Sequence, residues 1–509
     1  MNDKTVGPFA AEFVDTLRDL NRFIREVGVY LVGIILASGG AFIFQTNIMM
    51  DDWFSFSDNA YYQSVDTVRQ GRPIFALWSR LAQNSFPLHP FNTVLFYATL
   101  AVFAFVVFRR WSESPWARLL LVSLFVTSPF LAEHLQFGCN QIPMAFALLM
   151  ASLWFVTISV QQDERHWLAF AVGVVAATLA IATRWEIVFL TLGCAAIELS
   201  RTALQGSPGL MKRLPIVTLS FLLSVILAVM LIVGAVYASG LGFQSGGNYG
   251  TEGLIRSMDQ FWPLVDRFMI YWKTFLFGSH FLFPAILKIL FLAIFLAFVV
   301  QCIVAKDYRR ILKAILVLIP LSIGPLVLGL VTTNYPFRYT AVYPLALFPC
   351  YLACLAVSLP RGIVWARGIA IAAGSAIILI SAANLSGAQV RLNNLNRLEF
   401  STMTQFLAQI RTADVPDWKI ALLGKYTDPK RQESRAWDWN SLECGVFNCW
   451  SNPLGSMLNL TLMDNNAEGR IFTVSDADKA ILQPTLDGMP NGSSRLVRLD
   501  DSRWVILLK

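Results

Sequence analysis

Long apolar runs recur along the chain of 509 residues, and they constrain its fold more than any other feature. A helix needs about 20 predominantly apolar residues to cross the hydrocarbon core of a bilayer. Only 14% of the residues are charged, against about 25% in typical soluble domains, and most of these charges lie between the runs. We therefore predict a polytopic α-helical membrane protein with about eleven spans. The expected spans are 28–48, 92–108, 118–133, 142–160, 168–183, 187–199, 214–238, 281–304, 311–331, 341–359 and 364–383.

The range 168–199 is ambiguous, because it is too long for one helix and short for two, and Arg184 and Glu186 lie near its middle. One pass instead of two would move every later loop to the other side of the membrane. Cytoplasmic loops carry an excess of Lys and Arg, and two passes gather the basic loops on one side. We therefore favour two short helices, with a cytoplasmic N terminus and an external C terminus. The basic residues gathered in this way are Arg109, Arg110, Arg118, Lys212, Arg213, Lys306, Arg309, Arg310, Lys313, Arg361 and Arg367.

Residues 1–27 precede the first span and predict an amphipathic helix on the cytoplasmic membrane surface. The segment is too long and too mixed in charge for the n-region of a cleavable signal peptide. Its apolar residues recur at helical spacing opposite a row of arginines. The two rows are Phe13, Leu17, Leu20 and Ile24, and Arg18, Arg22 and Arg25.

Three longer segments are expected outside the cytoplasm. They are the loops 49–91 and 239–280, which belong to a transmembrane domain over 28–383, and the tail 384–509. A tail of about this length is sufficient for a small domain of its own. We predict a small periplasmic α/β domain there. Its expected elements are a helix at Met403–Ile410 and strands at Lys419–Leu423, Ile471–Val474, Leu496–Leu499 and Trp504–Leu508.

Cys444 and Cys449 form a C-x4-C pair in this tail. Outside the cytoplasm such a pair can form a disulfide, which we favour over two free thiols. The other cysteines fall within or beside apolar runs and are expected to be buried apolar residues. With four His in the chain we expect no metal centre, and the scattered positive charge does not indicate nucleic-acid binding.

The first span is followed by two adjacent carboxylates, Asp51 and Asp52, and then by Trp53. Ionisable groups at a membrane boundary are candidates for function, and one of two adjacent acids can have a raised pKa that suits a proton acceptor. The alternative is that they only end a membrane helix and face water. From position alone the two interpretations are equally good.

Several cations and polar residues are expected on the same outer side. Arg72 precedes an apolar stretch that predicts an interfacial helix, and it could bind either a phosphate or lipid headgroups. Arg184 could do the same, although a salt bridge to Glu186 is slightly favoured. The further candidates for this side are Arg338, Lys273 and His280 as phosphate ligands, and Trp53, Glu133, His134, Glu186 and Tyr335 as lining of an acceptor or sugar pocket.

Together these residues match the needs of an enzyme that uses a polyprenyl-phosphate sugar. Such an enzyme needs a carboxylate base for the acceptor hydroxyl, cations for the departing phosphate and an apolar groove for the lipid. General-base catalysis contributes about 10²–10⁴-fold, and stabilisation of the developing phosphate charge contributes at least as much.

The outer Asp-Asp pair after the first span, the Gly71-Arg72 that follows and the span number resemble the bacterial GtrII-type glucosyltransferases of the GT-C superfamily. The resemblance covers residues 28–383. It implies a GT-C-like membrane fold and transfer of glucose from undecaprenyl phosphate to lipopolysaccharide O-antigen or a related glycan, on the periplasmic face of the bacterial inner membrane. A separate synthase and flippase would supply the donor.

The resemblance also implies roles for individual residues. Asp51 or Asp52 would be the base of an inverting, metal-independent displacement, with Asp51 slightly favoured. No cofactor is expected, although a weakly bound divalent cation at this pair stays open. Arg72, Arg184 and Arg338 are chosen as phosphate ligands by their predicted side of the membrane.

Three alternatives compete with this interpretation. A transporter or flippase of lipid-linked sugars would place helix-breaking or ionisable residues near the bilayer midplane, and Pro320 and Pro325 do interrupt one span. A scaffold or sensor would use the tail as a binding module and would not need Asp51 or Asp52. A GT-C relative could also move mannose, arabinose or an amino sugar. We favour the glucosyltransferase.

Overall fold

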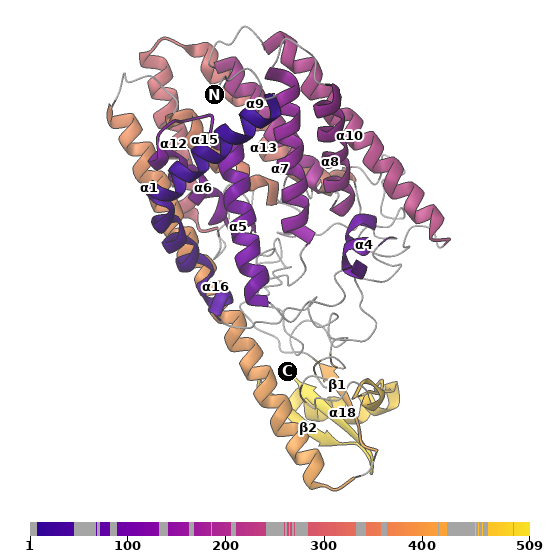
Figure 1. The fold of residues 1–509 in the computed structure, drawn as a ribbon. Coiled ribbons are helices and arrows are strands. Elements are labelled where there is room, and N and C mark those ends of the chain that lie inside the picture. The colour runs from indigo at the N-terminus through magenta and orange to yellow at the C-terminus, as the bar shows by residue number, and fades with distance from the viewer. Residues whose placement is uncertain are drawn as a thin grey trace.

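The structure is a computed structural model whose described part is a helical bundle with a small C-terminal sheet (Figure 1). This confirms the prediction of a mainly helical protein with a small C-terminal α/β unit. The described residues are 8–44, 68, 72–81, 89–131, 141–161, 167–184, 186–204, 210–240, 259, 262–263, 265–266, 269, 283–331, 343–357, 364–415, 417–424, 454, 457, 461, 467–491 and 493–509.

Each of the apolar ranges expected to span overlaps a helix of the bundle. The range 168–199 forms two helices, α8 and α9, as favoured from the positions of the basic loops. The helices of the bundle are α1 (Pro8–Phe44), α5 (His89–Phe108), α6 (Pro115–Val126), α7 (Gln141–Gln161), α8 (Trp167–Thr183), α9 (Ile187–Leu204), α10 (Leu210–Ala238), α12 (Ala285–Val304), α13 (Tyr308–Val331), α15 (Leu347–Val357) and α16 (Val364–Thr412). Short 3₁₀ helices at Pro129–Leu131 and Tyr343–Ala346 adjoin α6 and α15.

Five helices within the described residues are long and apolar enough to cross a membrane. In α10 the most apolar window has a mean hydropathy of 3.0, yet only 17% of it is buried in the protein. An apolar surface of this kind is stable against lipid and not against water. The chain is therefore a membrane protein, whereas its full span number stays a prediction. The five stretches are Ala11–Ala41, Ile187–Leu204, Pro215–Ala238, Ala285–Val304 and Val364–Thr412.

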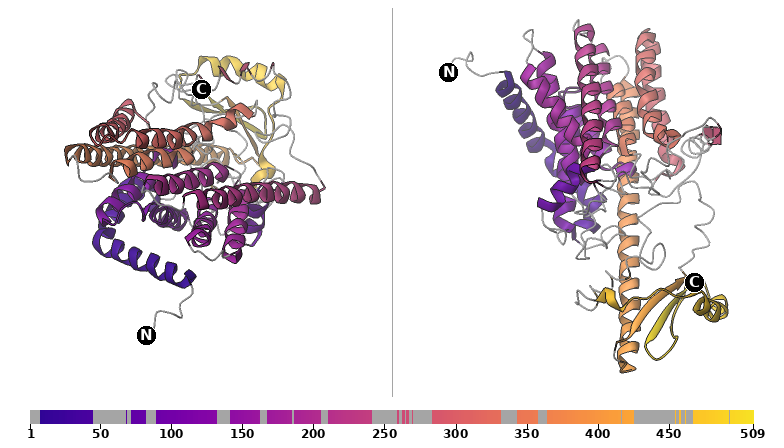
Figure 2. Two further views of the ribbon diagram at one scale, coloured as in Figure 1. Left: turned by 90° about the horizontal axis from the view of Figure 1, so that it is seen from above. Right: turned by 90° about the vertical axis from the view of Figure 1, so that its right-hand side faces the viewer.

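The helices run alternately up and down, so that their connections gather at two ends (Figures 1 and 2). We call these the N-terminal end, where α1 starts, and the sheet end, from which α16 continues to the C-terminal sheet. Polar bonds tie helices across the bundle: Ser224 Oγ of α10 donates to the Val174 carbonyl of α8 over 3.3 Å, and Gln389 Nε2 of α16 donates to the Ser38 carbonyl of α1 over 2.9 Å. Both bonds satisfy polar groups that water cannot reach.

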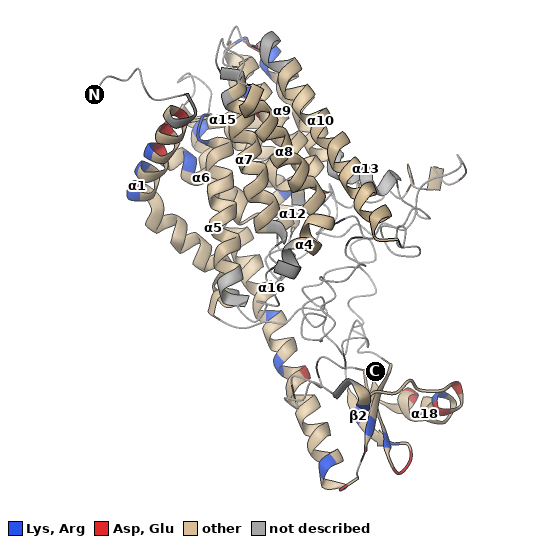
Figure 3. Ribbon diagram, turned by 45° about the vertical axis from the view of Figure 1, so that its right-hand side comes forward, with Lys and Arg blue, Asp and Glu red and all other residues tan. Residues whose placement is uncertain are grey.

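The amphipathic segment and the first span are one helix, α1, instead of two elements. No proline interrupts residues 9–44, so nothing forces the helix to end near residue 27. The charged residues lie in its N-terminal half, and the helix changes direction before its apolar half (Figure 3). The exposed side chains of Phe13, Leu17 and Ile24 are consistent with a helix at the membrane surface.

The expected boundary between membrane domain and tail, 383/384, lies inside α16, which runs unbroken over 49 residues. At 1.5 Å per residue this helix is about 73 Å long, more than twice the hydrocarbon core of about 30 Å. The expected helix at Met403–Ile410 is its last part. Beyond the bundle α16 stays helical because a buried apolar stripe that includes Leu392, Met403 and Phe406 continues along it.

The sheet has the order β1 (Lys419–Gly424), β3 (Arg503–Leu508), β2 (Ser494–Arg498), with β3 parallel to β1 and antiparallel to β2. Alternate residues of β3 face opposite sides. Ile506 and Leu508 pack on the end of α16, whereas Val505 and Leu507 pack with Leu482 of α18 (Asp476–Gly488). The sheet is thus the middle layer between two helices.

Three of the four expected strands are present with boundaries within two residues of the predicted ones. The fourth, Ile471–Val474, is not a strand. Only Ile471 forms a single parallel bridge, with Ile420, because the chain leaves the sheet edge and starts α18 at the capping residue Ser475.

Candidate functional site

Most of the predicted site lies outside the described residues. This holds for the two candidate bases, for three of the five candidate phosphate ligands and for the expected disulfide. Phe44, the last residue of α1, precedes Asp51 by seven positions. Of the predicted site residues the structure describes Arg72, Arg184 and Glu186. Those outside are Asp51, Asp52, Trp53, Glu133, His134, Lys273, His280, Tyr335, Arg338, Cys444 and Cys449.

Arg184 and Glu186 lie in the short link between α8 and α9, at the sheet end of the bundle. Their side chains are buried, with 3% and 0% exposed. Arg184 Nε lies 3.3 Å from Glu186 Oε2, and Arg184 Nη2 donates to Glu186 Oε1 over 3.4 Å. The salt bridge favoured from the sequence is therefore present. Because both charges are desolvated, each fixes the position of the other.

Arg72 is also buried, at 8% exposure, and directly precedes α4 (Pro73–Leu81). Its carbonyl accepts a 3.0 Å bond from the amide of Ala76, and Pro73 has the fixed φ that suits the first position of a helix. The side chains of Phe75 and Ala76 in this helix are buried, so the helix packs against the rest of the protein. The short helix predicted after Arg72 is therefore confirmed, but it packs into the protein instead of lying free at an interface.

Helix α4 contacts both α8 and α10. Since Arg184 directly follows α8, the two buried arginines are held by elements that touch each other at the sheet end (Figure 1). A buried arginine presents several donors in a fixed plane, which suits phosphate oxygens better than a mobile lysine would.

A polar face on α16 was not found from the sequence. Three polar side chains, Asn393, Asn396 and Glu399, are buried, while Leu398 between them is 55% exposed. Asn396 is 5% exposed, and both its amide atoms are buried with no hydrogen-bond partner among the described residues. A buried amide normally makes several hydrogen bonds, so this one requires an explanation.

The polar face of α16 lies level with the end of α1. The two helices run in the same direction, and Ser38 and Gln389 are hydrogen-bonded. Both helices rise 1.5 Å per residue, so Phe44, six residues after Ser38, lies at about the level of residue 395 of α16. Asn393 and Asn396 therefore flank the level at which α1 ends and the segment that contains Asp51 and Asp52 begins.

The signal for this face was available in the sequence RLNNLNRLEF, residues 391–400. Its polar residues at 393, 396 and 399 recur at the spacing of one helical face. The sequence alone does not say whether these polar side chains or Leu398 point inward, and burial of the amides instead of Leu398 is the unexpected result.

A second polar cluster, also missed, joins α1 to the N-terminal end of the bundle. Arg109 and Arg110, in the turn after α5, both pair with Glu12 of α1. Arg118 Nη2 of α6 lies 3.5 Å from Asp19 Oδ2 of α1. These pairs hold the N-terminal half of α1 against the helices. The positions of the acidic residues between 12 and 19 do not indicate which basic loop would form ion pairs with them.

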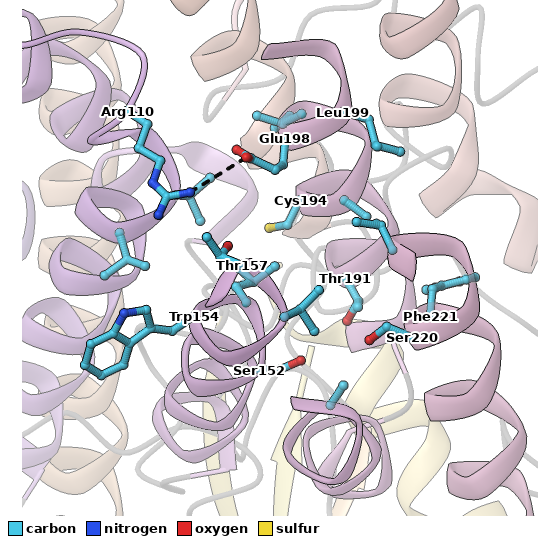
Figure 4. A pocket seen from close by; sticks show the side chains of 18 of the residues that line it. Arg110, Ser152, Trp154, Thr157, Thr191, Cys194, Glu198, Leu199, Ser220 and Phe221 are labelled. Atoms are coloured by element: carbon cyan, nitrogen blue, oxygen red, sulfur yellow. Dashed lines mark ion pairs between the residues drawn. The ribbon is translucent and has the colours of Figure 1, made fainter. Parts of the chain in front are cut away.

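A cavity of about 90 Å³ lies beside this cluster, between α5, α7, α8, α9 and α10 (Figure 4). Arg110 Nη1 lies 3.9 Å from Glu198 Oε1 at its edge. Hydroxyl groups of several helices line it, among them those of Ser152, Thr191 and Ser220. Within the described residues no three His, Cys, Asp or Glu side chains are grouped as a metal site would require.

The fold and these sites define a helical membrane protein that carries a small α/β domain beyond one end of its bundle. Comparison with protein-family models, with curated proteins and with solved structures found no match.

Proposed function

We propose that the protein is an inverting, GT-C-type glycosyltransferase of the bacterial inner membrane. It moves a sugar from a polyprenyl-phosphate donor to a glycan such as lipopolysaccharide O-antigen. The resemblance to the GtrII-type enzymes implies that this sugar is glucose. The reaction takes place at the sheet end, which is periplasmic, and a separate synthase and flippase supply the donor.

The observation that carries the proposal is the burial of Arg72 and Arg184 on contacting elements at this end. Burial of a cation is costly and marks a candidate functional site. Glu186 already pairs with Arg184, so Arg72 is the arginine that we assign to the donor phosphate, which a guanidinium group binds well. The polar face of α16 adds amide groups of the kind that bind sugar hydroxyls.

The proposed chemistry is a single displacement. The acceptor hydroxyl attacks the anomeric carbon of the donor sugar and loses its proton to Asp51 or Asp52. The bond between the anomeric carbon and the phosphate oxygen breaks, and its electron pair leaves with the polyprenyl phosphate. Arg72 stabilises the charge that develops on that phosphate. Glu186 holds Arg184 in place, and Arg338, Lys273 and His280 remain further candidates for the phosphate site.

Trp53, Glu133, His134 and Tyr335 are proposed to line the pocket of the sugar and acceptor, together with Asn393 and Asn396. The reaction as written needs no metal, and a weakly bound cation at the two aspartates is a separate possibility that chelation tests.

The direct test is transfer by the purified protein from labelled polyprenyl-phosphate glucose to lipid-linked glycans. Asp51→Asn or Asp52→Asn should abolish transfer, and Arg72→Ala should raise the KM for the donor. The matched controls are Asp501→Asn, an exposed aspartate of the C-terminal domain, and Arg309→Ala, an exposed arginine at the opposite end. Transfer should survive EDTA. Full transfer in both aspartate variants contradicts the assignment of the base.

A second function, movement of a lipid-linked sugar across the membrane, is favoured by one observation. The cavity beside Arg110 and Glu198 contains hydroxyl groups inside the helical bundle, where a transported polar group would need them. A flippase would carry labelled donor across sealed vesicles without any acceptor and without need of Asp51 or Asp52.

A further inference from the structure

A groove of about 410 Å³ lies on the outside of the bundle, between α1, α6 and α16, and extends from the N-terminal end. It is separate from the sheet end and from the cavity described above. Its walls are mainly apolar. They include Ile34 of α1, Leu120 of α6 and Ile378 of α16, and Leu379 at its edge is 70% exposed. An apolar groove on the exposed side of a membrane protein lies against lipid chains.

One end of the groove is positive. Arg367, in the first turns of α16, lines it and is exposed, and among the described residues it has no ion-pair partner. Ser114, the N-cap residue of α6, lines the same end, and its side chain makes no capping hydrogen bond. Pro115 has no amide N–H, so the donors without the usual side-chain acceptor are the amides of Trp116 and Ala117. A helix N-terminus and a cation together attract an anion.

A second polar group lies deeper in the groove. Ser123 of α6 is fully buried and lines the groove, and in the part of the chain that the structure describes its hydroxyl has no hydrogen-bond partner. In a helix a serine hydroxyl ordinarily bonds to the carbonyl of the preceding turn. Ser123 is nine residues, or about 14 Å, along α6 from Ser114, so it faces the acyl chain and not the headgroup of a lipid whose phosphate lies at the start of α6.

Aromatic residues mark the level of the membrane surface at the positive end. Trp116 contacts Tyr30 of α1 with ring centroids 5.1 Å apart, and both are more than half exposed, as is Trp365. Trp and Tyr concentrate at the boundary between lipid headgroups and chains. Arg367 and the start of α6 therefore lie at headgroup level.

The length of the groove matches one leaflet. From Arg367 to Leu379 the helix α16 rises by 12 residues, or about 18 Å, close to half of a hydrocarbon core of about 30 Å. We propose that the groove binds one anionic phospholipid from the leaflet at the N-terminal end. Its phosphate lies between Arg367 and the start of α6, and one acyl chain follows the groove. The inference does not depend on the proposed glycosyl transfer.

One nearby charge opposes this binding. Glu113 precedes Ser114 and is exposed, so it repels an anionic headgroup at the same end. Removal of the Glu113 charge should therefore strengthen binding of the anionic lipid. The experiment thus includes one variant that is expected to bind more tightly.

The experiment is native mass spectrometry of delipidated full-length protein titrated with phosphatidylglycerol or with phosphatidylcholine of the same acyl chains. We expect one phosphatidylglycerol per protein, with binding about ten-fold weaker in Arg367→Gln, as for loss of one charge-assisted contact. Ser375→Phe, at an exposed position that lines the groove, should exclude the acyl chain. Glu113→Gln should bind more tightly. The matched control Arg309→Gln removes an exposed arginine of the same end from α13, which does not line the groove.

Three results overturn the proposal. The first is equal binding of both lipids, unchanged in Arg367→Gln, because it shows an apolar groove that accepts any chain. The second is an equal loss in Arg309→Gln, which shows a diffuse charge effect. The third is binding of glycerol phosphate as tight as that of the lipid, which identifies a site for a free phosphate. Gel filtration and circular dichroism show that each variant is folded before titration.

Discussion

At the scale of single residues, the charges that attach α1 to the bundle are the clearest structural contacts. Glu12 pairs with Arg109, whose side chain is only 7% exposed, and with Arg110. Removal of one partner leaves buried guanidinium groups with less compensation. Asp15 and Arg18, three and six residues further on the same helix, form a pair in which both side chains are exposed.

We expect Glu12→Gln to destabilise the protein by about 2 kcal/mol, because a buried donor loses its charged acceptor. Asp15→Asn, the matched control, should cost less than about 1 kcal/mol, as surface pairs do. Thermal unfolding of both variants in one detergent measures the difference. Equal shifts in the two midpoints contradict the arrangement of α1 described above.

A substitution at Asn396 can distinguish a role of this side chain in stability from a role in substrate binding. Replacement of an unpartnered buried amide by an apolar side chain of similar size is neutral or stabilising. We therefore expect Asn396→Leu to keep or raise the unfolding temperature while glycosyl transfer falls at least about ten-fold, as for loss of one substrate hydrogen bond.

The control for this variant is Asn394→Leu, an exposed asparagine two residues away on the same helix. It should change neither stability nor transfer. A stable Asn396→Leu protein with full transfer shows that the polar face of α16 does not bind substrate.

At the scale of elements, α16 is the helix whose length most exceeds the length that hydropathy predicts. The apolar pattern ends near residue 383, and a boundary there is the natural expectation. The helix continues because residues 384–412 lack proline and alternate buried apolar and polar positions at helical spacing, a pattern that hydropathy averages do not register.

Gly387 tests the continuity of α16. It is exposed in mid-helix, and a Cβ atom there would meet no other atom within 4 Å. Gly387→Ala should therefore stabilise the protein by about 0.5–1 kcal/mol, whereas Gly387→Pro should destabilise it by about 3 kcal/mol or more. Unfolding temperatures measure both changes. A helix that ended at the expected boundary would give no gain for alanine.

Other elements were predictable because their signals do not depend on tertiary contacts. The distribution of basic loops along the chain separated α8 from α9, and short strand-like runs located β1, β2 and β3. The Arg184–Glu186 pair was accessible because its members are two positions apart. The contacts of Glu12, Asp19 and Glu198 join segments far apart in the sequence, and no local pattern identifies such partners. The proposed base at Asp51 or Asp52 lies outside the described residues and stays a prediction.

At the scale of the whole molecule, the two termini lie at opposite ends of the bundle (Figure 1). We therefore expect epitope tags at the two termini to be accessible from opposite sides of the membrane, because the helices alternate in direction. Protease treatment of sealed, right-side-out vesicles should remove the C-terminal tag only, and detergent should expose both. Removal of both tags from intact vesicles contradicts this topology.

We propose that glycosyl transfer takes place at the sheet end. Its most direct test is a measurement of labelled sugar in oriented proteoliposomes that contain polyprenyl-phosphate glucose, with a glycan acceptor supplied on one side at a time. The proposal predicts labelled glycan only when the acceptor faces the C-terminal domain. Labelled donor that crosses the membrane unchanged, with no labelled glycan on either side, would contradict the claim and support the flippase.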